Sequence, residues 1–162
     1  MANFSFDRKF AMIIAPFRAF QALTDGDDIK QSLACIYEHL AEDGIFIVNV
    51  FNPYPVMDES WCHGETIQLE RFDESTGNYI VKKSSGDKID TKNQVIYPRF
   101  IYEITSADGR TERVEDDLRL KYYYRDQLRE VVENAGLNIV EEYSWYDKTP
   151  PGGREIIFVC KR

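Results

Sequence analysis

The sequence predicts an α/β protein built around a strand–helix–strand unit near the N-terminus. Residues 10–15 and 45–51 are apolar at consecutive positions, which is typical of interior strands in a parallel sheet covered on both faces. A stretch of helical period, residues 27–42, separates them, so the unit should be a right-handed βαβ crossover. In sheets of this kind the ligand lies outside the carboxyl ends of the strands.

The expected helix over residues 27–42 has an apolar stripe and recognisable ends. The stripe falls on one helical face and consists of Ile29, Leu33, Ile36, Tyr37 and Leu40. Asp25, Asp27 and Asp28 stand at the start, where carboxylates suit the free N–H groups and the helix dipole. Gly44 follows the end, and we expect it to form a left-handed cap.

The pattern changes after residue 51, and residues 65–123 predict antiparallel strands. We expect turns at residues 74–78, 84–87 and 107–110, the last of which contains the Asp-Gly pair that strongly indicates a tight hairpin. Pro98 falls inside a strand pattern, which indicates an edge or a bulge at that position.

The helical period returns near the C-terminus. Residues 126–135 predict a helix that Gly136 ends, and residues 137–143 and 155–160 predict two further strands. The expected order is therefore β-α-β, an antiparallel insert, and α-β-β. We accordingly expect one domain formed by residues 1–58 and 118–162, interrupted by a β-subdomain over residues 59–117.

Composition limits the classes of function. The chain has 162 residues and a net charge of −8, which disfavours binding to nucleic acid. No apolar run approaches the roughly 20 residues that span a bilayer, and the N-terminus does not resemble a signal peptide. Three cysteines without paired spacing favour free thiols and a cytoplasmic location.

Three stretches in this order resemble class I S-adenosylmethionine-dependent methyltransferases. Residues 10–20 resemble the fourth strand of that family and the loop after it, and residues 40–49, LAEDGIFIVN, resemble its fifth strand. Residues 123–137 resemble its last helix and the start of its sixth strand. The final strand would then be the reversed seventh, inserted between the fifth and the sixth.

The resemblance also implies what this chain lacks. The first strand of the family, its Gly-rich cofactor loop and the acidic residue that holds the ribose have no counterpart, and residues 1–4 resemble those just after the Asp that contacts adenine. The resemblance thus implies a truncated Rossmann-like methyltransferase sheet with strand order 4-5-7-6, its last strand antiparallel, and an inserted antiparallel β-subdomain. The fourth strand would be an open edge.

The cofactor, by resemblance, is S-adenosylmethionine. The residues that would bind it lie at the end of the first strand and in the loop after it, which lines the sulfonium in the family; they are Ala15, Pro16, Phe17, Arg18 and Phe20. The alternative interpretation places Phe17 and Phe20 in the core and makes Arg18 an ordinary surface charge.

The candidate substrate-binding residues are Asn49, Asn52, Tyr54, Trp61, Tyr122, Tyr124 and Arg125. Amide and phenol groups at the end of the second strand could orient a substrate by hydrogen bonds, although turn formation beside two prolines explains them equally well. Trp61 could form an aromatic wall, and the tyrosines could instead pack in the sheet. The adjacent Cys62 and His63 lack the spacing of a zinc site or a catalytic dyad.

Two functions compete on the sequence alone. The first is a methyltransferase fragment that acts on a small molecule and binds its cofactor poorly by itself, with no catalytic side chain or metal, because the sulfonium is already activated. The second is a non-enzymatic binding or assembly module that pairs through its open strand edge. Either leads us to expect a homodimer or a partner chain that supplies the missing strands.

Overall fold

The computed structural model describes residues 2–162. Met1, and with it the first position of the resemblance noted for residues 1–4, lies outside the described residues. The chain divides into two compact units. The first consists of Met1–Val56 and Lys121–Arg162, and the second of Met57–Leu120.

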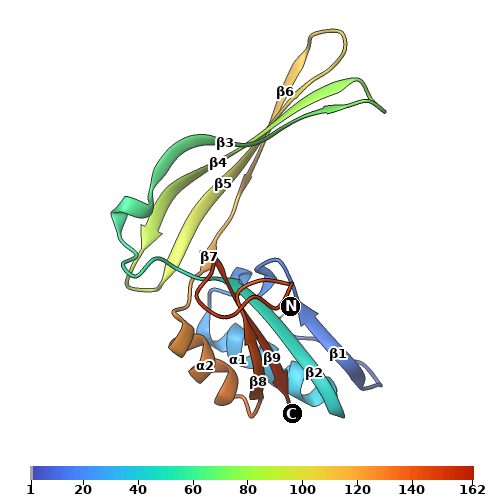
Figure 1. Cartoon of the computed structure of the whole chain (residues 1–162), viewed down its shortest axis with the longest axis vertical. Coiled ribbons are helices and arrows are strands. Elements are labelled where there is room, and N and C mark those ends of the chain that lie inside the picture. Colours follow the sequence, from blue (N-terminus) through green and yellow to red (C-terminus); the bar gives the residue numbers. More distant parts are fainter. Residues whose placement is uncertain (1) are drawn as a thin grey trace. The chain divides into compact units, whose positions relative to one another are not determined.

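The first unit is a four-stranded sheet with two α-helices (Figure 1). Its elements are β1 (Phe10–Ala15), a 3₁₀ turn (Ala19–Ala22), α1 (Gly26–His39), β2 (Leu40–Phe51), α2 (Arg125–Glu133), β8 (Asn138–Tyr143) and β9 (Glu155–Lys161). The strand order is β1-β2-β9-β8, with β1 parallel to β2 and β9 antiparallel to both of its neighbours. This confirms the expected 4-5-7-6 order with a reversed last strand and β1 at the edge.

The expectation that both faces of the two apolar strands are covered is wrong for β1. Phe46, Val48 and Val50 of β2 pack in one core cluster with buried residues of both α1 and α2, so both helices cover the same face. On the opposite face Met12 and Ile14 of β1 are 55% and 56% exposed. Some apolar side chains of β1 are therefore left exposed on the face that the helices do not cover.

Helix α1 begins as expected but ends earlier. The Asp25 carboxylate accepts hydrogen bonds from the backbone N–H groups of Asp27 and Asp28, which confirms the cap. The helix ends at His39, and β2 starts at once, so Gly44 lies inside a strand. A Cβ at Gly44 would lie 2.9 Å from the Phe10 carbonyl oxygen, so the glycine permits close backbone approach and is not the predicted cap.

The C-terminal elements follow their sequence pattern closely. Leu128 and Val132 are the buried residues of α2, and Gly136 has a φ of +84°, the left-handed conformation expected after a helix. A side chain at Gly136 would also crowd Tyr37, whose ring lies 3.2 Å from the position of a Cβ. The glycine thus meets both a backbone and a packing requirement.

The second unit is an antiparallel sheet with strand order β3-β4-β5-β6. Its elements are a 3₁₀ turn (Glu59–Trp61), β3 (His63–Asp73), β4 (Asn78–Asp90), β5 (Val95–Thr105) and β6 (Thr111–Asp117), and the two-residue β7 (Leu120–Lys121) follows at the boundary. The turns at residues 74–78 and 107–110 are confirmed, with Gly109 at a φ of +82°.

The turn predicted at residues 84–87 is wrong, because β4 continues through it to Asp90. The Ser-Ser-Gly-Asp composition instead marks a bulge: the register shifts between Gly86 and Lys88, opposite Pro98, where an irregularity was expected. Gly86 is required there by packing, since a Cβ would lie 3.0 Å from the Trp61 ring.

Ion pairs link the strands of the second unit. The Arg113 guanidinium contacts Glu65 at 2.6 Å, Glu103 at 2.9 Å and Glu115 at 2.7 Å. The Lys83 ammonium contacts Glu103 at 2.6 Å and Glu65 at 3.6 Å. Hydrogen bonds from Arg113 and Lys83 respectively lower the pKa of Glu65 and of Glu103 below the ordinary value of 4.5.

These shifts predict acid sensitivity of the second unit. A carboxylate with a lowered pKa stabilises the folded state above its unfolded pKa and loses that contribution as the pH falls through the folded value. We expect the thermal unfolding temperature of this unit to decrease when the pH is lowered below about 4.5. Trp61 fluorescence in a Trp145→Phe background would follow the unfolding. The double variant Glu65→Gln, Glu103→Gln should show a weaker pH dependence; equal dependence in both proteins would contradict the assignment.

Candidate functional site

The carboxyl ends of β1 and β2 bring together a set of buried polar side chains. Because β9 runs antiparallel to β2, its first residue, Glu155, pairs with Phe51, the last residue of β2. The turn after β1 reaches the same place through Arg18, which contacts both Asn49 and Glu155. Glu155 is 6% exposed and Asn49 of β2 is 2% exposed. The strand ends at which such folds bind their ligands therefore carry a buried carboxylate and a buried amide.

Two consecutive residues of the turn after β1 adopt left-handed backbone conformations. Phe17 has a φ of +50° and Arg18 a φ of +66°, and neither is glycine. Each such residue costs about 1–2 kcal/mol relative to the right-handed conformation. Strain of this kind persists only where neighbouring groups hold it, and it is frequent at functional sites.

A hydrogen-bond network holds this turn. The Arg18 N–H donates to Asn49 Oδ1 at 3.1 Å, and Asn49 Nδ2 donates to Glu155 Oε2 at 2.9 Å. The Arg18 guanidinium forms an ion pair with the Glu155 carboxylate, with Nε 3.2 Å from Oε1. The Tyr146 hydroxyl donates to Asn49 Oδ1 at 3.0 Å and accepts from the Phe17 N–H at 3.3 Å.

The predicted cofactor residues divide into two groups. Ala15, Pro16, Phe17 and Arg18 lie together at the end of β1, and the Phe17 side chain is 83% exposed. Phe20 is fully buried against Tyr123, with ring centroids 6.1 Å apart, so it belongs to the core as the alternative interpretation held. Phe17 does not join that core.

The predicted substrate residues of β2 and its following loop differ in environment. Asn49 is committed to the network and is buried. The Asn52 side chain donates to the Gly153 carbonyl at 2.9 Å and its N–H donates to the Arg154 carbonyl at 2.8 Å, so it ties two loops together. Tyr54 is exposed.

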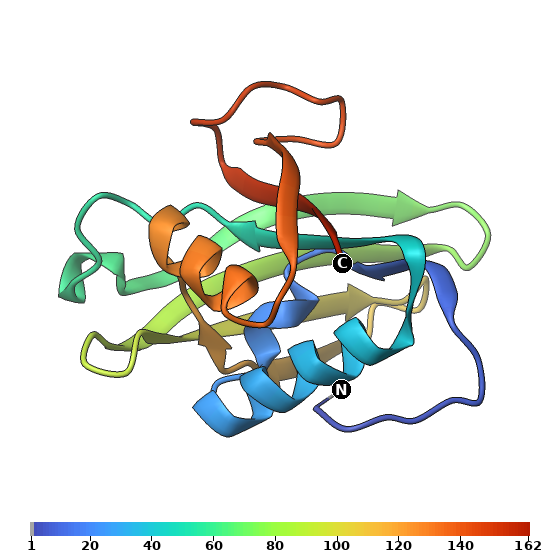
Figure 2. The same cartoon turned by 90° about the horizontal axis from the view of Figure 1, so that it is seen from below.

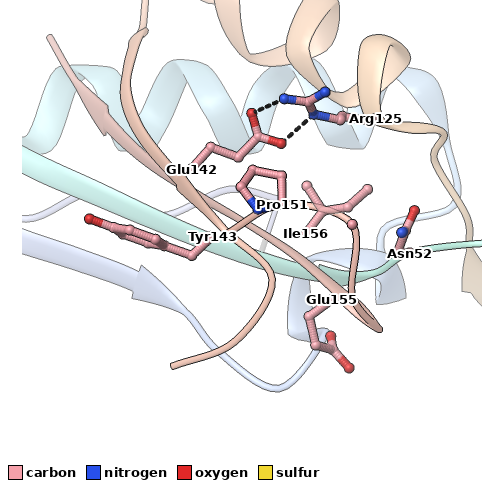
Figure 3. A pocket seen from close by; sticks show the side chains of 8 residues that line it. Asn52, Arg125, Glu142, Tyr143, Pro151, Glu155 and Ile156 are labelled. Carbon is pink, nitrogen blue, oxygen red and sulfur yellow. Dashed lines mark hydrogen bonds and ion pairs between the residues drawn. The ribbon is translucent and has the colours of Figure 1, made fainter. Parts of the chain in front are cut away.

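Arg125 lines a small open pocket of about 160 Å³ in the first unit. The pocket is bordered by Asn52, Arg125, Glu142, Tyr143, Pro151, Gly152, Glu155 and Ile156. Figure 3 shows the Arg125 guanidinium facing the Glu142 carboxylate, with Nη2 2.6 Å from Oε2, while Glu155 points away from this pair. The positive charge of Arg125 at this pocket is therefore neutralised by Glu142.

The remaining predicted residues are spread over both units. Tyr122 is buried and Tyr124 half-buried, and their rings contact each other at 6.0 Å between centroids. Trp61 lies in the second unit, where it packs over Gly86 and near the His63 ring. Among residues 2–162, no group of three or more His, Cys, Asp or Glu side chains could hold a metal ion. No helix in that range is long and apolar enough to cross a bilayer.

Three buried or half-exposed polar residues of the site escaped the sequence analysis. Glu155 could have been found, because a reversed last strand places its first residue at the carboxyl ends of β1 and β2. Gln21 is fully buried. Its side chain accepts a hydrogen bond from the Phe51 N–H at 2.9 Å and donates one to the Lys121 carbonyl at 2.7 Å. Neither Gln21 nor Tyr146 stands in a pattern that indicates its role.

Known structures share this arrangement. An S-adenosylmethionine-dependent methyltransferase from Clostridium acetobutylicum superposes with a TM-score of 0.79 at 16% identity, covering 99% of this chain and 61% of its own. DesVI from Streptomyces venezuelae gives 0.77 at 16% identity, with coverage of 99% and 61%. CalS10 from Micromonospora echinaspora, an amino pentose methyltransferase, gives 0.71 at 18% identity with the same coverage.

The fold is that of the S-adenosylmethionine-dependent methyltransferases. The likeness extends over nearly the whole chain, including the antiparallel second unit, because 99% of it is covered. The chain spans about 61% of the length of these methyltransferases. No protein-family model matches the sequence, and no curated protein matches it.

Proposed function

We propose that the chain is the acceptor-side part of an S-adenosylmethionine-dependent methyltransferase that acts on a small molecule. The observation that carries the proposal is the strained Phe17–Arg18 turn, held by buried Asn49 and Glu155 at the carboxyl ends of a methyltransferase sheet. Strain stored at the ligand edge of such a sheet supports a binding role for the turn.

The similar structures support a small-molecule acceptor. CalS10 is an amino pentose methyltransferase and KedS8 from Streptoalloteichus is a sugar N-methyltransferase, which superposes with a TM-score of 0.70 at 16% identity. Both share the antiparallel second unit with this chain, since each comparison covers 99% of it. We infer an acceptor of similar size, in keeping with the acidic net charge of −8, which disfavours a nucleic-acid substrate.

The exposed residues of the turn fit one part of the cofactor. An apolar ring beside a neutralised ion pair, as Phe17 stands beside Arg18 and Glu155, suits the region around a sulfonium. S-Adenosylmethionine, when bound, supplies an already activated methyl group. The role of this chain is then to position the acceptor and to exclude water, because alignment of the two reactants can supply about 7–11 kcal/mol of the barrier.

By itself the chain should bind the cofactor weakly, because it spans about 61% of the length of the similar methyltransferases and the resemblance gives no counterpart of their Gly-rich cofactor loop or ribose-binding acid. We expect S-adenosylmethionine to bind in the millimolar range, with NMR shifts confined to residues 15–18, Asn49 and Tyr146. Phe17→Ala should reduce these shifts, whereas Phe72→Ala, an exposed phenylalanine of the second unit, should leave them unchanged. Micromolar affinity would contradict the incomplete site, and shifts located elsewhere would contradict the methyltransferase assignment.

A second candidate function is an assembly module, favoured by the unpaired edge of β1 and by the exposed Met12 and Ile14 beside it. An open strand edge is a template for pairing with another chain, and exposed apolar surface promotes association. The occupant would be a second copy or a chain that supplies further strands. Light scattering on the NMR samples distinguishes a monomer from an associated form, and an apolar dye reports exposed apolar surface. A monomer that binds no dye would argue against assembly.

A further inference from the structure

The sheet of the second unit has two chemically different faces. Its strands β3, β4, β5 and β6 run from green to gold in Figure 2 and pair in that order. Successive side chains of a strand point to opposite faces, so the register assigns each paired residue to one face. The ion pairs that Arg113 and Lys83 form with Glu65, Glu103 and Glu115 all lie on one of them. We call the opposite one the apolar face.

The apolar face presents aliphatic and aromatic side chains from all four strands. Leu69 of β3 and Val114 of β6 are 52% and 43% exposed, and half-buried side chains of β4 and β5 lie between them. Its apolar members are Leu69, Ile80, Phe100, Tyr102, Ile104 and Val114. Residues 57–120 form this sheet, its loops and one 3₁₀ turn, so the unit has no helix of its own to cover the face. A sheet with an apolar face usually packs that face against a second layer.

Three rows of residues cross the face in register from β3 to β6. The first consists of Arg71, Ile80, Ile104 and Glu112, the second of Leu69, Lys82, Tyr102 and Val114, and the third of Thr66, Ser84, Phe100 and Asp116. Arg71 stands at the β3 edge, whereas Glu112 and Asp116 stand at the β6 edge. The Lys82 ammonium lies over the Phe100 ring, 4.6 Å from its centroid. The face is therefore apolar in the middle, basic at one edge and acidic at the other.

Such a face is complementary to a second copy of itself. When a two-fold axis parallel to the strands relates two copies, β3 of one lies over β6 of the other, and each row meets the same row of its partner. Arg71 then faces the partner's Glu112, and Lys82 faces the ring of the partner's Tyr102. The aliphatic positions of the first two rows meet one another. Aligned sheets cross at about 30°, so the central positions fit most closely and the long side chains reach across at the edges.

The other face-to-face two-fold arrangement is repulsive. An axis perpendicular to the strands, along the middle row, places each strand over its own copy. Lys82 would then face the partner's Lys82, and Glu112 would face the partner's Asp116. Like charges placed opposite one another disfavour an interface. The charges of the face therefore select the axis parallel to the strands.

We propose that the apolar face is a homodimer interface, in which the second units of two copies pack face to face about a two-fold axis parallel to their strands. The proposal is independent of the methyltransferase assignment, and its surface is distinct from the β1 edge. The shortest of the four strands, β6, has seven residues. Four strands of that length offer about 450 Å² of flat sheet per copy, which side-chain relief enlarges, whereas a standard interface buries about 800 Å² per partner. We therefore expect dissociation in the micromolar range.

Sedimentation analysis between about 1 and 200 µM brackets that range. The matched variants are Leu69→Glu and Met12→Glu, which place the same charge at side chains that are 52% and 55% exposed. Leu69→Glu should raise the dissociation constant about tenfold or more, and Met12→Glu should leave it unchanged. A monomer at every concentration, or a dimer that survives Leu69→Glu, would overturn the proposal. A dimer lost only in Met12→Glu would assign association to the exposed side of β1 instead.

Charge reversal tests the symmetry of the dimer. Arg71→Glu and Glu112→Arg each create two like-charge contacts, because the two-fold axis repeats them, and each should weaken the dimer about tenfold. The double variant restores opposite charges and should recover most of the affinity. Both residues are exposed, so all three proteins should stay folded. If both single variants weaken the dimer and the double variant does not recover it, the proposed axis is wrong.

Discussion

Phe20→Ala should lower the free energy of unfolding of the first unit by about 3–5 kcal/mol, whereas Phe17→Ala should change it by about 0.5 kcal/mol or less. The two phenylalanines lie three residues apart in the turn after β1, but Phe20 is fully buried and Phe17 is 83% exposed. Truncating Phe20 removes apolar contacts and leaves a cavity beside Tyr123. Truncating Phe17 removes little buried surface.

Urea unfolding followed by Trp145 fluorescence in a Trp61→Phe background measures both variants. Phe17→Ala should instead affect ligand binding, as expected for an exposed ring at a site. Similar destabilisation by both substitutions would show that Phe17 packs in the core, and would remove the physical basis for its proposed role. A stable Phe20→Ala protein would contradict the packing described here.

The sequence pattern predicted the strands and helices of the first unit, and the resemblance predicted the order of its strands, but neither placed every helix end and turn correctly. Continuous apolar runs and one amphipathic helix predicted β1, α1 and β2, and the order of the strands followed from the resemblance. Gly44 misled because glycine serves both caps and close backbone approaches, and only the partner, here the Phe10 carbonyl, distinguishes the two uses. Residues 84–87 misled similarly, since a bulge and a turn use the same residue types.

Site residues that directly follow a strand in the sequence could be predicted. Residues whose role depends on contacts with sequence-distant residues could not. Phe17 and Arg18 follow β1, so their location could be inferred from the strand itself. Phe20 has the same local context, and only packing against Tyr123 reveals that it is buried. Tyr146 lies 97 residues from Asn49, and its loop carries no pattern that indicates the contact.

Glu155→Leu should destabilise the first unit by about 2–3 kcal/mol and release the turn after β1. The substitution keeps a buried side chain of similar size but leaves Asn49 Nδ2 and the Arg18 guanidinium without their acceptor. Removing one member of a fully buried ion pair costs about 3–5 kcal/mol. The smaller value is expected here because Arg18 is half-exposed and can turn to water.

The matched control is Glu141→Leu, which removes a carboxylate paired with Lys148 at the surface and should cost about 0–1 kcal/mol. Amide hydrogen exchange at Phe17 and Arg18 provides the second measurement. Their left-handed backbone is held by Asn49 and, through it, by Glu155, so exchange should accelerate in Glu155→Leu and stay unchanged in Glu141→Leu. Unchanged exchange in both variants would mean that the turn is strained for a reason independent of the buried carboxylate, and the role of Glu155 would reduce to stabilising the start of β9.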